Sequence, residues 1–227
     1  MTPSPVAVTI GLLIAVLADA PPAGAQSGLR PYAGGSVGNF SVSADEAEGR
    51  SASGGFFVGV ALAKYVDVEF DVVVPTHSFT RTYTGASVSF APPGASPAEH
   101  DRLSVITRFD KEREVSASIS AVVIIHPTAG QRITPGLIVG LTNQRARDRT
   151  VYTPISIPEG IDPEHPAVVG RTESSARNIG GPTIGGQLAI AVTPRLSIVP
   201  DVRYDYGSIG DEINNTLRVS ARVQWRF

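Results

Sequence analysis

Charged side chains at even spacings mark three segments of this chain, and groups placed in this way could form a network of ion pairs. Successive residues of a β-strand point to opposite faces, so residues at even spacings share one face. The nine residues are Asp67, Glu69 and Asp71, then Asp201, Arg203 and Asp205, and finally Arg218, Arg222 and Arg226. The chemistry they predict is charge pairing, provided that the fold brings the three faces together.

The histidines are the other residues that could carry out chemistry. His77 precedes Ser78, and His100 and His165 lie beside acidic residues. A nucleophilic triad needs serine, histidine and acid within hydrogen-bond reach. The chain shows no nucleophile elbow, no metal-ligand spacing and no phosphate-binding loop. The sequence therefore predicts no catalytic residue, and an active site around His77 is the least favoured hypothesis.

The overall composition narrows the class of protein. None of the 227 residues is cysteine, and the formal net charge is −2. Without cysteine there is no disulfide framework and no thiolate metal site. A near-neutral chain also lacks the basic surface of a nucleic-acid-binding protein. We therefore expect no metal, no cofactor and no nucleic-acid partner.

The first residues resemble a secretion signal. Residues 6–17 form an apolar run that is shorter than the about 20 residues of a membrane-spanning helix, and residues 23–25 read Ala-Gly-Ala. Small residues after a short apolar run are typical of a signal-peptide cleavage site. We expect residues 1–25 to be a signal peptide and residues 26–227 to form one domain; a buried first strand is the alternative.

The remaining chain has the alternation of β-strands. In residues 66–74 five large apolar side chains fall on one face, and three acids with Val73 on the other; residues 217–227 alternate apolar with polar or basic side chains. Strict alternation over such a length predicts a strand with one apolar face. Eight strands are predicted, at 31–42, 54–63, 66–74, 112–125, 132–143, 178–192, 195–206 and 217–227.

The connections between these strands alternate in length. Short turns follow the second, fourth and sixth strands, whereas the other connections are long and polar, above all 75–111 and 144–177. This order is typical of outer-membrane barrels, and strands in lipid must close into a ring. We predict an all-β, eight-stranded antiparallel up-and-down transmembrane β-barrel with both termini periplasmic. A soluble barrel or sandwich, with the apolar faces packed inside, is the alternative.

The chain resembles the small bacterial outer-membrane β-barrels of the OmpA/OmpX-like superfamily. The resemblance depends on the apparent signal peptide, the first strand at 30–35, the tight turn at 192–196 and the final Trp-Arg-Phe. It implies a location in the bacterial outer membrane, contact with outer-membrane lipid and insertion by the barrel-assembly machinery. It also implies that the alternating C-terminal residues Ala221, Val223, Trp225 and Phe227 form the assembly signal.

Three functions are compatible with such a barrel. An eight-stranded barrel is only wide enough for side chains to fill, so the nine charged residues are expected to pair and plug the lumen. The favoured function is a non-enzymatic barrel in envelope integrity or surface interaction, with a partner bound by the loops 75–111 and 144–177. A narrow channel for ions or small solutes is the alternative, and a lipid-modifying outer-membrane enzyme with its active site around His77 is the least favoured. Interfacial aromatic girdles are expected at Tyr32, Tyr65, Tyr204, Tyr206 and Trp225.

Overall fold

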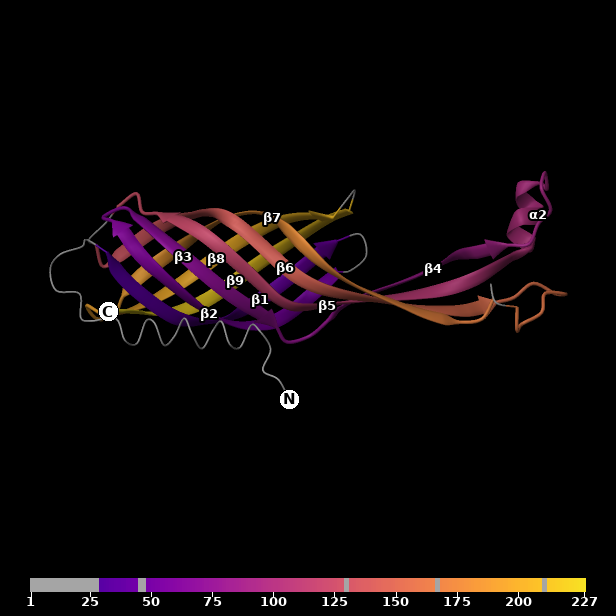
Figure 1. The fold of residues 1–227 in the computed structure, drawn as a ribbon, viewed down its shortest axis with the longest axis horizontal. Coiled ribbons are helices and arrows are strands. Elements are labelled where there is room, and N and C mark those ends of the chain that lie inside the picture. The colour runs from indigo at the N-terminus through magenta and orange to yellow at the C-terminus, as the bar shows by residue number, and fades with distance from the viewer. Residues whose placement is uncertain (1–28, 45–47, 129–130, 166–167, 210–211) are drawn as a thin grey trace.

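The computed structural model describes residues 29–44, 48–128, 131–165, 168–209 and 212–227 (Figure 1). The predicted signal peptide, residues 1–25, lies outside the described residues. The described part contains no helix long and apolar enough to cross a membrane. Its elements are β1 (Arg30–Ala44), β2 (Glu48–Ala63), β3 (Val66–Pro75), β4 (Phe79–Ser89), α2 (Pro97–Arg102), β5 (Ser104–Ile125), β6 (Ile133–Ser156), β7 (Arg171–Ala191), β8 (Leu196–Ile209) and β9 (Glu212–Arg226).

Eight of these strands close into an antiparallel ring. β1 pairs with β2 on one side and with β9 on the other, so that Gly35 lies opposite both Phe56 and Val223. The ring continues through β3, β5, β6, β7 and β8 in chain order. The predicted eight-stranded up-and-down barrel is therefore confirmed, and each predicted strand corresponds to one strand of the ring.

The ring has apolar side chains outside and polar ones inside. Phe70 and Val219 are 41% and 47% exposed, whereas the neighbouring Glu69 and Arg222 are 2% and 3% exposed. An apolar exterior around a whole ring is unfavourable in water and matches the lipid-facing band of a membrane barrel. The predicted transmembrane facing is thus confirmed, and the reverse packing of a soluble barrel is excluded. Other outward apolar residues are Leu137, Leu141, Ile184, Ile198, Val202 and Val223.

A ninth strand and the long ends of three others form an arm that projects from one end of the barrel (Figure 1). β4 pairs with the first half of β5, where Thr82 lies opposite Asp110. The first half of β5 also pairs with the second half of β6. The second half of β6 in turn pairs with the start of β7. The prediction that residues 75–111 and 144–177 form loops is therefore wrong, because most of these residues are in strands.

The short helix α2 lies at the far end of the arm (Figure 1). Ser96 caps its first turn: the backbone N–H of Glu99 donates to Ser96 Oγ, and the Glu99 carboxylate accepts from the backbone N–H of Ser96. This capping box satisfies N–H groups that a helix start leaves free. The backbone hydrogen bond from Ser96 also holds the pKa of Glu99 below its usual value.

Candidate functional site

Three strands position the charged network inside the barrel. β8 and β9 are neighbours, and β3 lies across the ring from β8. Because side chains alternate between faces, the acids of β3 point into the lumen towards the arginines of β8 and β9. The members are almost completely buried, and this set of seven residues is called the lumen ion network: Glu69, Asp71, Asp201, Arg203, Asp205, Arg218 and Arg222.

Arg203 is the centre of the lumen ion network. Its Nη2 lies 2.8 Å from Glu69 Oε1 and its Nη1 3.3 Å from Asp71 Oδ1, both on β3. Its Nε lies 2.8 Å from Asp201 Oδ2 on its own strand. One guanidinium group therefore joins three carboxylates across the full width of the lumen.

The two arginines of β9 complete the network. Arg218 Nη1 lies 2.8 Å from Asp71 Oδ2, and its Nε lies 3.0 Å from Asp205 Oδ2. Arg222 Nη2 lies 2.7 Å from Glu69 Oε2, and its Nη1 lies 3.6 Å from an oxygen of Asp201. The predicted pairing of β9 with both β8 and β3 is present. Charges in so narrow a space are stable only when they are paired in this way.

Two of the nine predicted charged residues lie outside the network. Asp67 accepts a hydrogen bond at 3.1 Å from Nε2 of His126, which belongs to the turn after β5. Arg226 is exposed at the last residue of β9 and lines a cavity with Asp67 and His126 at this end of the barrel. Arg226 therefore lies outside the lumen ion network, because its strand end is at the height of Asp67 and beyond the acids of the network.

Aromatic side chains that the sequence did not place in the lumen support the network. The guanidinium carbon of Arg222 lies 3.7 Å from the centre of the Phe57 ring, a cation–π contact. Tyr32 is 2% exposed and donates to Glu69 Oε2 at 3.3 Å. The prediction that Tyr32 belongs to an interfacial girdle is wrong, whereas Tyr65, Tyr204, Tyr206 and Trp225 are exposed.

Gly59 makes room for Tyr32. A Cβ at Gly59 would come within 2.3 Å of Cζ of the Tyr32 ring. We expect Gly59→Val to displace Tyr32 and to lower the free energy of unfolding in lipid vesicles by about 1–3 kcal/mol, as overpacking does. Gly35→Val is the matched control, because Gly35 is exposed and its nearest contact would be 3.7 Å. Equal effects of the two changes would contradict the packing of Tyr32.

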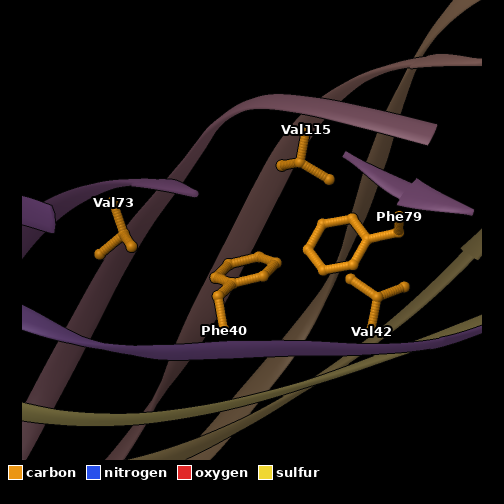
Figure 2. Close-up of a cluster of buried hydrophobic side chains, with 5 residues drawn as sticks. All are labelled: Phe40, Val42, Val73, Phe79 and Val115. Carbon is orange, nitrogen blue, oxygen red and sulfur yellow. The ribbon is translucent and has the colours of Figure 1, made fainter. Parts of the chain in front are cut away.

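An apolar cluster lies in the lumen where the arm begins. Figure 2 shows the side chains of this apolar plug facing one another inside the ring. Phe40 is fully buried, and its ring centre lies 6.0 Å from that of Phe79, the first residue of β4. The lumen thus contains a packed apolar cluster as well as charges, which the sequence does not predict. The plug consists of Phe40, Val42, Val73, Phe79 and Val115.

A second ion cluster lies on the face of the arm that continues the lumen wall. Arg113 is 2% exposed, and its Nε and Nη2 donate to the two oxygens of Asp148 at 2.6 and 3.2 Å. Arg177 pairs with the same carboxylate, and Arg113 Nη1 donates to Asn214 Oδ1 at 3.1 Å. This cluster fixes β5, β6 and β7 to β9 at the base of the arm.

Farther along the same face is a pocket with aromatic and polar walls, here called the arm pocket. Its volume is about 400 Å³, and its rings come from Tyr83, Phe109 and Tyr152. Tyr152 donates to Glu173 Oε2 at 2.9 Å, and burial, together with Glu173, raises the pKa of Tyr152. Its phenol therefore remains protonated at neutral pH and keeps its hydrogen bond to Glu173.

The histidines do not form a water-excluded catalytic group. Ser78 donates to Glu112 Oε1 at 2.6 Å, whereas His77 Nδ1 lies 2.7 Å from Thr76 Oγ1. At the end of the arm, His100 Nδ1 lies 3.1 Å from Ser89 Oγ, and this contact is exposed to solvent. The described residues also contain no group of three or more His, Cys, Asp or Glu side chains placed to hold a metal ion.

Comparison with known proteins identifies the fold. No protein-family model matches this chain, and no curated protein sequence matches it. The outer-membrane protease OmpT from Escherichia coli is similar in structure, with a TM-score of 0.50 at 9% identity, over 87% of this chain and 97% of that one. This chain folds as an outer-membrane β-barrel. At such low identity the likeness concerns the fold alone.

Two further outer-membrane proteins align with similar coverage. Neisserial surface protein A aligns over 88% of this chain and 98% of its own, at 16% identity and a TM-score of 0.48. The outer-membrane protein OprG from Pseudomonas aeruginosa aligns over 90% of this chain and 98% of its own, at 9% identity and a TM-score of 0.44.

Proposed function

We propose that the protein is a non-enzymatic outer-membrane barrel with a sealed lumen, which holds the arm at the cell surface for interaction with a partner. One observation carries this proposal: the interior is filled at two levels, by the lumen ion network and by the apolar plug. A pore of this width is obstructed by paired opposite charges. The part of the molecule left for recognition is the arm.

The orientation proposed for the barrel follows from its two ends. The C-terminus and the short turns lie at the end opposite the arm (Figure 1), and in outer-membrane barrels short turns are periplasmic. Both termini are therefore periplasmic in the proposed orientation, and the arm is extracellular. We propose that Ala221, Val223, Trp225 and Phe227, which all point outwards, are read by the barrel-assembly machinery during insertion.

Electrical recording in planar bilayers tests the sealed lumen. We expect the purified protein to insert without producing stable conductance steps, because the guanidinium groups of Arg203, Arg218 and Arg222 span the lumen. Insertion is checked separately by protection of the barrel strands from added protease. Reproducible conductance steps from the inserted protein would contradict the proposal and favour the narrow channel.

A substitution of His77 tests whether the protein modifies lipids. The Ser78 hydroxyl is bonded to Glu112 rather than to histidine, so His77→Ala should leave the composition of the outer-membrane lipids unchanged. Mass spectrometry of lipids from cells with the wild type, the variant or neither protein makes the comparison. A modified lipid that requires the wild-type protein and disappears with His77→Ala would contradict the non-enzymatic assignment.

A further inference from the structure

A row of three aromatic rings crosses the arm. Tyr83 on β4 lies opposite Phe109 on β5, which lies opposite Tyr152 on β6. The rings of Tyr83 and Phe109 are stacked at 4.8 Å and 9°, and Phe109 meets Tyr152 edge-on at 5.3 Å. Such pairs stabilise a sheet, but the row remains open to solvent, since Tyr83 is 41% exposed.

The rest of the lining of the arm pocket is polar. It consists of hydroxyl and carboxylate groups from β6 and β7, among them Thr150, Glu173 and Ser175. Aromatic rings on one side and convergent hydrogen-bonding groups on the other are suited to a pyranose ring. Its C–H face packs on aromatic surface, while its hydroxyl groups bind polar side chains. The volume of about 400 Å³ lies within the roughly 300–1,000 Å³ of small-molecule sites.

Basic groups exceed acidic ones around the arm pocket. Lys111 Nζ lies 5.5 Å from the centre of the Tyr83 ring, and Arg171 Cζ lies 4.5 Å from that of Tyr152. Asp148 is shared by Arg113 and Arg177, and Glu173 is paired with Arg171 at 3.0 Å. Of these residues, Lys111 and Arg177 line the pocket together with the two acids. Arg113 and Arg171 pair with those acids from beside the pocket, so the whole group has a formal charge of +2, which is complementary to an acidic ligand.

We infer that the arm pocket binds an oligosaccharide that carries acidic groups, an inference that rests on the proposed role of the arm in surface interaction. The pocket lies on the face of the arm that continues the lumen wall, together with Arg113 and the plug residue Val115. The lipid headgroups of the same membrane surround the outside of the barrel. The ligand is therefore a saccharide from outside the cell rather than the glycolipid of the membrane itself.

Calorimetric titration of the full barrel in nanodiscs tests this inference. The probes are a galacturonic acid hexamer, a sulfated heparin hexasaccharide and the neutral maltohexaose. At least one acidic probe is expected to bind at least tenfold more tightly than maltohexaose, with an affinity that falls as salt is added. Lys111→Gln should weaken that binding about tenfold, the usual effect of losing one charge-assisted hydrogen bond. Tyr83→Leu should weaken it as well.

Arg149→Gln is the matched control, because it removes one positive charge from the outward face of the arm, where Arg149 is exposed opposite Glu112. It should leave the affinity unchanged. Equal losses with Lys111→Gln and Arg149→Gln would overturn the inference, since the binding would then follow the net charge of the arm. Equal affinity for maltohexaose, or abolition of binding by lipopolysaccharide in the nanodisc, would overturn it as well.

Failure of this inference can be distinguished from failure of the proposed function. A barrel that binds none of the saccharides but inserts without conductance overturns the inference and leaves the sealed barrel intact. Conductance steps together with saccharide binding would overturn the sealed lumen and support the arm pocket. Limited proteolysis of each variant verifies that the arm is folded before either conclusion is drawn.

Discussion

Arg203→Met is expected to lower the free energy of unfolding by about 3–5 kcal/mol, the usual loss when one partner of a buried ion pair is removed. Arg203 is 2% exposed and joins Glu69, Asp71 and Asp201. Methionine fills much of the same volume but leaves three buried carboxylates with less positive charge. Urea-dependent unfolding in lipid vesicles, followed by the fluorescence of Trp225, measures the effect.

Arg226→Met is the matched control for this prediction. Arg226 is exposed at the end of the barrel, and an exposed charge contributes between about 0 and 1 kcal/mol. Adding Glu69→Gln to Arg203→Met should recover part of the lost stability, because one uncompensated charge is removed. Equal free energies of unfolding for Arg203→Met and Arg226→Met would show that the lumen ion network does not stabilise the barrel.

The second large effect is expected in the apolar plug. Phe40→Ala should lower the free energy of unfolding by about 3–5 kcal/mol, because a cavity is left where a buried ring was. Phe40 is fully buried against Phe79, Val42 and Val73 (Figure 2). The same urea titration in vesicles gives the measurement.

Phe70→Ala serves as the control, since Phe70 is outward-facing and 41% exposed. Acyl chains can fill the space that this ring leaves, so no cavity forms and the loss should be clearly smaller. A larger loss at Phe70 than at Phe40 would mean that the lumen is not closed by a packed apolar layer.

The ring and its facing could be predicted because a single physical rule decides them. A strand that contacts lipid on one side and the lumen on the other must alternate apolar and polar side chains. Val68, Glu69 and Phe70 show this pattern. The positions of seven of the nine charged residues follow from the same alternation. The height of each residue along its strand decides which charged groups meet. Arg226 is the last residue of its strand and therefore lies beyond the acids of the lumen ion network.

The arm could not be predicted by that rule, because both of its faces meet water. Residues 80–84 alternate threonine with arginine and tyrosine, so no apolar face appears, and the sequence predicts part of a loop there. The β-branched threonines were the available signal. Tyr32 was misplaced for another reason: its space in the lumen exists only because the paired residue is Gly59.

Accessibility of spin labels in bilayers tests the central claim most directly, and the chain has no cysteine of its own to interfere. Labels on single cysteines at Val219 and Val223 should collide with oxygen and be shielded from a water-soluble nickel complex, because these residues face acyl chains. A label at Thr84 on the arm should show the reverse. Labels at Val219 and Val223 that are shielded from both reagents would place these residues in a packed interior and contradict the account.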